Sequence, residues 1–122
     1  MRAAGLCPIA TVLQTEAVLI KSSTTKHRDL ARLIDVVTSR IAGVIAARKY
    51  VVCEYNIPRQ KLSQATALTP GRRAPTISPL EAPDWAAVSS MVEKAQIADI
   101  MDELVNIGAE DIMIFNLDNC RI

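Results

Sequence analysis

Aromatic side chains are scarce in this sequence, and so are the residues from which most catalytic centres are built. Phe, Trp and Tyr together make up 3% of the 122 residues, and His27 is the single histidine. A sheet that binds RNA needs exposed aromatic side chains for stacking, and a nucleophilic enzyme pairs Ser or Cys with a base. The four glycines form neither a G-x-G-x-x-G motif nor a phosphate-binding loop. Residue types alone therefore predict no self-contained active site.

Cysteines are also few, and their spacing indicates neither a metal site nor a disulfide framework. Cys7, Cys53 and Cys120 are far apart and form no C-x-x-C pair, which is typical of reduced thiols. No apolar run reaches the roughly 18 residues of a transmembrane helix, and the first ten residues are too mixed for a signal peptide. We expect a cytoplasmic protein without membrane contact or metal site.

An excess of charge of either sign is missing as well. The 14 Lys and Arg residues nearly balance the 13 Asp and Glu residues, giving a net charge of +1. This balance argues against a nucleic-acid partner, which favours a clear basic excess. Locally, residues 93–111 are acidic, whereas the 59–73 region is basic through Arg59, Lys61, Arg72 and Arg73. Both regions can be solvated surface, or they can be complementary faces that meet in an oligomer.

What is abundant is aliphatic residues, and their spacing predicts the elements of the first half. Residues 14–23 have a β-branched, apolar centre and predict a strand. Residues 27–49 predict an amphipathic helix, because apolar residues recur at steps of three and four; these are Leu30, Leu33, Ile34, Val37, Ile41, Val44 and Ile45. Gly43 lies inside this helix at a cost of about 1 kcal/mol relative to Ala, which suggests that another element approaches closely there.

The second half predicts six elements in a recognisable order. They are a strand over 50–58, a short helix over 58–68, an edge strand over 74–78, a strand over 85–92 that forms a hairpin with it, a helix over 94–107 capped by Gly108, and a strand over 111–117. This order predicts an α+β fold, the ferredoxin-like βαββαβ arrangement, with both helices on one face of an antiparallel sheet. The fold alone gives no function, so candidate site residues are sought at the strand ends.

Three long stretches resemble a known family. "YNIPRQKLSQATALTPGRRAPTISPL", "DWAAVSSMV" and "MDELVNIGAEDIMIFNLDNCRI" are similar to the carboxyl-terminal region of the long, fungal-type ATP phosphoribosyltransferase, the first enzyme of histidine biosynthesis. "MRAAGLCPIATVLQTEAVLIKS" resembles the end of its second catalytic lobe. The resemblance implies a lobe remnant over 1–25, a connecting helix over 26–49, and a ferredoxin-like, histidine-binding regulatory domain over 50–122.

The resemblance also implies an activity that belongs to a longer protein. The family transfers the phosphoribosyl group of PRPP to ATP with Mg²⁺, in a hexamer that histidine inhibits by feedback. The sequence begins after the position of the family's PRPP loop, so we expect this chain alone to lack transferase activity, to contain no catalytic residues and to bind no Mg²⁺.

Four residues fall on the family's histidine-binding positions. Thr76 matches the family pattern, whereas Asn56 replaces an acidic residue and Arg72 replaces a leucine of bacterial forms. Asp111 replaces a small residue and would restore the missing carboxylate. The resemblance therefore implies histidine binding through Asn56, Arg72, Thr76 and Asp111. The alternative is a structural oligomerisation module that binds no ligand.

Overall fold

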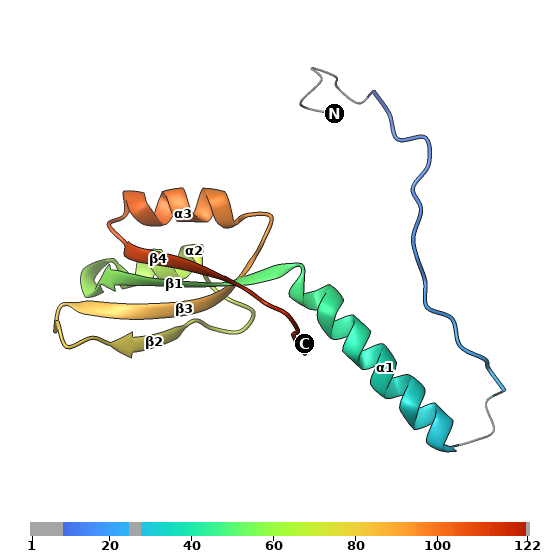
Figure 1. Ribbon diagram of the computed structural model, residues 1–122. Coiled ribbons are helices and arrows are strands. Elements are labelled where there is room, and N and C mark those ends of the chain that lie inside the picture. Colours follow the sequence, from blue (N-terminus) through green and yellow to red (C-terminus); the bar gives the residue numbers. More distant parts are fainter. Residues whose placement is uncertain (1–8, 25–27, 122) are drawn as a thin grey trace. The chain divides into compact units, whose positions relative to one another are not determined.

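A computed structural model describes residues 9–24 and 28–121 (Figure 1). The chain divides into two units, Met1–Ile34 and Asp35–Ile122, which we describe separately. The division lies within the first helix. The domain boundaries expected at 25/26 and 49/50 therefore stay predictions.

The strand expected over residues 14–23 is not formed. Residues 9–22 belong to no helix or strand, and their side chains are exposed. A strand satisfies its backbone N–H and C=O groups only through a neighbouring strand, and no described segment pairs with this one. The prediction of a strand over residues 14–23 is therefore wrong, although the β-branched composition of this segment is suitable for a sheet.

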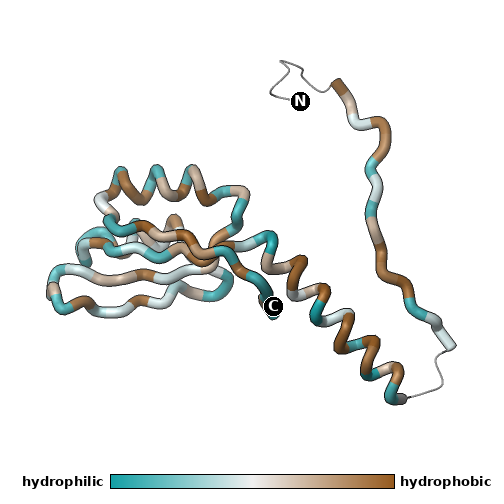
Figure 2. Tube along the Cα trace, viewed as in Figure 1, coloured by the Kyte–Doolittle hydropathy of each residue, from teal (hydrophilic) through white to brown (hydrophobic). Residues whose placement is uncertain are grey.

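The long helix is confirmed as α1, Arg28–Ala47. Its apolar stripe recurs along the helix as brown segments in Figure 2. Within the second unit the stripe residues Val37, Ile41, Val44 and Ile45 are exposed, whereas Ala46 and Ala47 are buried. The stripe is thus not part of the core that the sheet forms with the other helices.

The second unit contains a four-stranded antiparallel sheet in the order β2-β3-β1-β4. The elements after α1 are β1 Tyr50–Pro58, the 3₁₀ turn η2 Arg59–Lys61, α2 Leu62–Leu68, β2 Thr76–Pro79, β3 Trp85–Glu93, α3 Ile97–Asn106 and β4 Glu110–Asn116. This confirms the ferredoxin-like arrangement, including the edge position of the short β2. Helix α3 is shorter than the helix expected over 94–107, because residues 94–96 form a turn before it.

Alternation along β1 and β3 places the core on one face of the sheet. In β1, Val51, Cys53, Tyr55 and Ile57 are at most 1% exposed, and the residues between them are only partly buried. Apolar side chains of α2 and α3, among them Leu62 and Leu104, pack against the same cluster. Both helices therefore cover one face of the sheet (Figure 1). We call the opposite face, on which neither α2 nor α3 packs, the open face.

Gly43 allows the chain end to approach α1, as the sequence suggested. The backbone N–H of Cys120 donates to the Gly43 carbonyl oxygen over 3.0 Å. A Cβ atom at Gly43 would lie 2.7 Å from the Nη1 atom of Arg121 and closer still to the side chain of Asn119. A larger residue at position 43 would displace these side chains.

Candidate functional site

The open face carries two hollows that share Thr76 and Ser89. The first, which we call the acidic hollow, has a volume of about 220 Å³ and is lined by Glu54 and Asn56 together with the shared pair. The second, the basic hollow, has a volume of about 610 Å³ and is lined by arginines. Residues that the sequence separates by more than thirty positions therefore meet on one surface.

Strand register explains how the acidic hollow is assembled. Glu54 of β1 lies opposite Ser89 of β3, and Ser89 lies opposite Thr76 of β2. The three side chains form one row across the open face, because directly paired residues point to the same side of a sheet. The Ser89 hydroxyl donates to Oε1 of Glu54 over 3.0 Å, which fixes the carboxylate within the row.

Asn56 and Asp111 form a second polar pair at the edge of this row. The Asn56 amide donates from Nδ2 to Oδ2 of Asp111 over 2.9 Å. Asp111 is in the left-handed region with a φ of 51°, and the pairing of β1 with β4 shifts by one residue between Glu54 and Asn56. This is a β-bulge, a device that often redirects a side chain near a functional site, and Asp is among the residues that tolerate the left-handed conformation.

Arginines dominate the basic hollow. Arg72 and Arg73 line it from the turn before β2, and Arg121 lines it from the end of the described chain. The hydroxyls of Thr76 and Ser89 also line it, and none of its lining residues that the structure describes is an Asp or Glu. Among the described residues, the guanidinium groups of Arg72 and Arg73 have no ion-pair or hydrogen-bond partner. The hollow is thus suited to an anionic group.

A buried hydrogen-bond network holds the turn that carries Arg72. The Tyr55 hydroxyl and Thr69 Oγ1 are 2.7 Å apart, and the Ser90 hydroxyl donates to the Thr69 carbonyl oxygen over 2.9 Å. Burial raises the pKa of Tyr55 above its usual value of 10.0. Gly71 then turns the chain with a φ of +65°, a conformation that glycine adopts without the steric cost of a side chain. Arg72 therefore lies in a turn that hydrogen bonds hold in place, rather than in a free loop.

The structure brings the four expected site residues near one another, but in two groups. Asn56 and Asp111 are bonded, and Asn56 shares the acidic hollow with Thr76. Arg72 lines only the basic hollow on this face, where it again meets Thr76. Sequence reasoning missed Glu54 and Ser89. The signal for Glu54 was present, because a residue two positions before Asn56 in a strand points to the same face.

Other chemistry is limited in the described part of the chain. Cys53 is fully buried, and burial together with the nearby Glu54 carboxylate raises the pKa of its thiol to about 11, so it stays protonated and unreactive at neutral pH. Among the described residues, no group of three His, Cys, Asp or Glu side chains lies close enough together to hold a metal ion. None of the described helices is long and apolar enough to cross a membrane.

Fold and surface together define a small ferredoxin-like domain with two polar hollows on the open face of its sheet. Residues 47–119 match the family described as HisG, C-terminal domain, and the chain belongs to this family.

Curated fungal relatives extend the match to the whole chain. An ATP phosphoribosyltransferase of Yarrowia lipolytica is 57% identical over 122 residues, and one of Saccharomyces cerevisiae is 50% identical over the same length. One of Schizosaccharomyces pombe is 46% identical over 121 residues. The chain spans about 40% of the length of these relatives. Residues 9–22, which form no secondary structure, therefore also have counterparts in the longer proteins.

Proposed function

We propose that this chain is the histidine-binding regulatory part of an ATP phosphoribosyltransferase. Membership of the HisG C-terminal family and the names of the fungal relatives support the enzyme class. One observation supports the site most: Thr76 lines both the hollow that contains Glu54 and the hollow that contains Arg72. A ligand beside Thr76 thus has an acidic group on one side and a basic group on the other.

This charge arrangement suits a free amino acid. The α-ammonium group of histidine donates three hydrogen bonds and prefers a carboxylate, which Glu54 and Asp111 supply. The α-carboxylate matches the planar fork of an arginine, which Arg72 supplies. Thr76 and Ser89 contribute hydroxyls between the two ends. In this proposal Asp111 takes the place of the carboxylate that Asn56 lacks, and the Asn56 amide orients it.

The catalytic reaction belongs to the same proposal at the level of the longer protein. There, ATP and PRPP would be the substrates, Mg²⁺ the metal, a hexamer the assembly and the cytoplasm the location. Histidine bound at the open face would favour one of two states of that assembly, to the extent that it binds one state more tightly.

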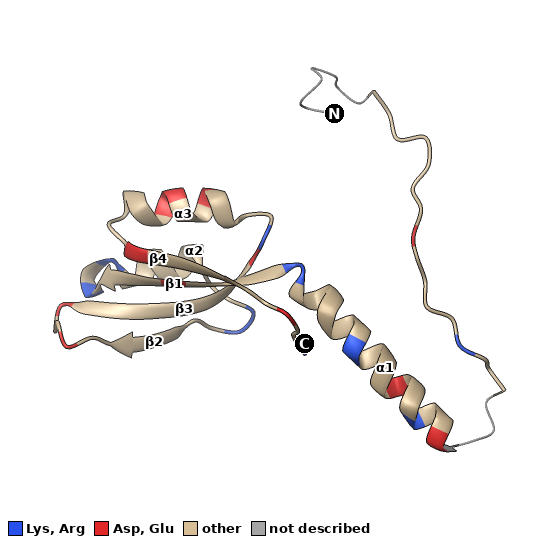
Figure 3. Ribbon diagram, in the orientation of Figure 1, with Lys and Arg blue, Asp and Glu red and all other residues tan. Residues whose placement is uncertain are grey.

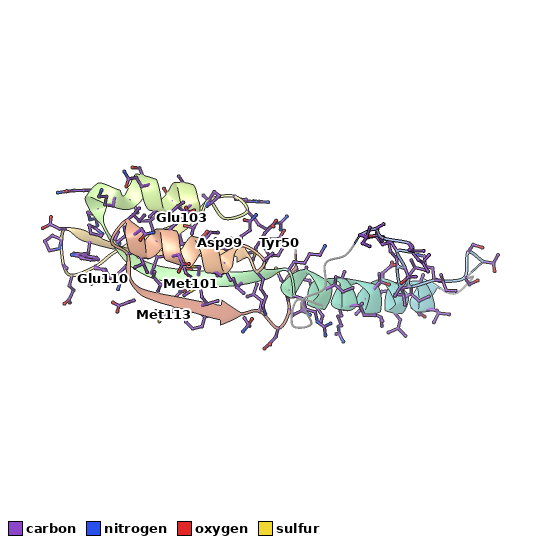
Figure 4. All side chains as sticks on the ribbon, turned by 90° about the horizontal axis from the view of Figure 1, so that it is seen from above. Tyr50, Asp99, Met101, Glu103, Glu110 and Met113 are labelled. Atoms are coloured by element: carbon purple, nitrogen blue, oxygen red, sulfur yellow. The ribbon has the colours of Figure 1, made fainter. Side chains whose placement is uncertain are left out.

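Calorimetric titration of the purified chain with L-histidine tests the site. We expect saturable binding, and we expect Glu54→Gln to weaken it about tenfold or more, because a charge-assisted hydrogen bond contributes about 1.5–3 kcal/mol. The glutamine keeps an oxygen that can accept from Ser89, so the fold is retained. Glu103→Gln is the matched control, since Glu103 lies on α3 and lines neither hollow (Figure 4). Absence of binding at millimolar histidine by a folded sample would refute the proposal.

The rival function is assembly without a ligand, and one feature of the open face favours it. Met113 and Phe115 of β4 are 48% and 47% exposed, an apolar edge that a second copy could cover. Acidic residues on α3 and at the start of β4 are separate from the basic turn, as Figures 3 and 4 show for Asp99, Glu103 and Glu110. Replacing Arg72 and Arg73 by Glu separates the two functions. Loss of oligomers in light scattering, with a wild type that does not respond to histidine, would favour assembly.

A further inference from the structure

The end of the described chain meets the basic hollow. Cys120 and Arg121 line it beside Arg72 and Arg73, which come from the turn before β2. Three arginines thus line a space of about 610 Å³, and none of the described residues that line it has a side-chain carboxylate. Guanidinium groups gathered without an acid attract an anionic ligand group, and their forks match a carboxylate in two-point geometry.

Arg121 is anchored, although it is exposed and close to the chain end. Its guanidinium donates from Nη1 to the carbonyl oxygen of Ser39 in α1. The amide of Asn119 donates to the Arg40 carbonyl over 3.4 Å, and the Cys120 backbone N–H donates to the Gly43 carbonyl over 3.0 Å. Three successive residues are therefore tied to one stretch of α1, which reduces the entropy that a ligand would have to remove on binding.

Gly43 makes this anchoring possible. A Cβ atom there would come within 2.7 Å of Nη1 of Arg121, well inside ordinary van der Waals contact. Glycine in the interior of a helix is unfavourable by about 1 kcal/mol relative to Ala. This unfavourable glycine stands where a Cβ atom would overlap the side chains of Asn119 and Arg121.

We propose that Arg121 is a further ligand-binding residue of the regulatory site, and that it holds the carboxylate of the amino-acid ligand together with Arg72. The inference rests on the proposed histidine site and adds to it a residue from a different part of the chain. A guanidinium has five N–H donors, and the bond to Ser39 uses one of them, so donors remain for the ligand. Because Arg121 is bonded to α1, a ligand held by Arg121 would also affect the position of this helix.

Calorimetry with two ligands tests the assignment. L-histidine has the carboxylate, whereas L-histidinamide keeps the imidazole and the ammonium but replaces the carboxylate by a neutral amide. We expect Arg121→Gln to weaken histidine binding about tenfold and to change histidinamide binding less than twofold. Arg48→Gln is the matched control, because it removes the same charge at an exposed position that lines a different hollow. It should leave both affinities unchanged.

Gly43→Ala tests the anchor from the side of α1. Alanine favours the helix but displaces Arg121, so we expect a melting temperature equal to or above that of the wild type and a several-fold weaker binding of histidine. Hydrogen exchange at the Cys120 amide, which bonds to Gly43, should slow when histidine binds to the wild type.

The outcomes separate this inference from the proposed function. If the wild type binds no histidine, the proposed function itself fails. If the wild type binds histidine and Arg121→Gln binds it equally well, or loses histidinamide binding to the same extent, the role of Arg121 is refuted while the histidine site stands.

Discussion

Leu104→Ala is expected to lower the free energy of unfolding by about 3 kcal/mol, within the range of 2–5 kcal/mol for leucine truncation in a packed core. Leu104 is the fully buried residue of α3 and belongs to the cluster that joins the helix to the sheet. Its truncation removes apolar contacts and leaves a cavity between the two layers. Urea unfolding followed by circular dichroism measures the loss.

The neighbouring residue provides the control. Val105 is 61% exposed on the same helix, and Val105→Ala removes methyl groups that contact mainly solvent while improving helix propensity. Its effect should stay within about 0.5 kcal/mol. Equal destabilisation by the two variants would contradict a core on the helix-covered face of the sheet.

Gly71→Ala is expected to reduce both stability and histidine affinity. A Cβ atom at this position meets the Ser90 hydroxyl at 3.0 Å, and φ is +65°. The left-handed conformation costs a non-glycine residue about 1–2 kcal/mol, and displacing Ser90 disturbs its bond to Thr69. We expect a loss of about 2 kcal/mol in urea unfolding. Because Arg72 follows directly, we also expect about tenfold weaker histidine binding in calorimetry.

Gly108→Ala separates strain from site geometry. Gly108 has a φ of +92°, nothing lies within 4 Å of a Cβ built there, and it follows α3 rather than the ligand surface. This variant should lose stability through backbone strain and keep its histidine affinity. If both glycine variants weakened histidine binding equally, the anchored turn would have no particular role in the site.

Local patterns were sufficient to predict most of the fold. Steps of three and four residues predicted α1, and the alternation of Val51, Cys53 and Tyr55 predicted β1, because these periods follow from backbone geometry. The prediction of a strand over residues 14–23 was wrong, because a local pattern does not show whether a partner strand is present. Its composition is suitable for a sheet, but the described residues supply no strand that pairs with it.

The candidate site was predictable only in part, because register and bulges decide which residues meet. The resemblance identified Asn56 and Asp111, but their hydrogen bond depends on the one-residue shift between β1 and β4. Nothing in the sequence indicated that Arg121 would line the same hollow as Arg72, since that proximity depends on the chain end crossing α1 at Gly43. Long-range contacts of this kind are not encoded in a local period.

The central claim, a histidine site on the open face of the sheet, is tested most directly by an NMR titration of the ¹⁵N-labelled chain with L-histidine. We expect saturable shifts of the amides of Glu54, Asn56, Thr76, Ser89 and Asp111, while amides of α3 on the covered face stay unchanged. Shifts confined to α3, or no saturable shift at millimolar histidine in a folded sample, would contradict the account.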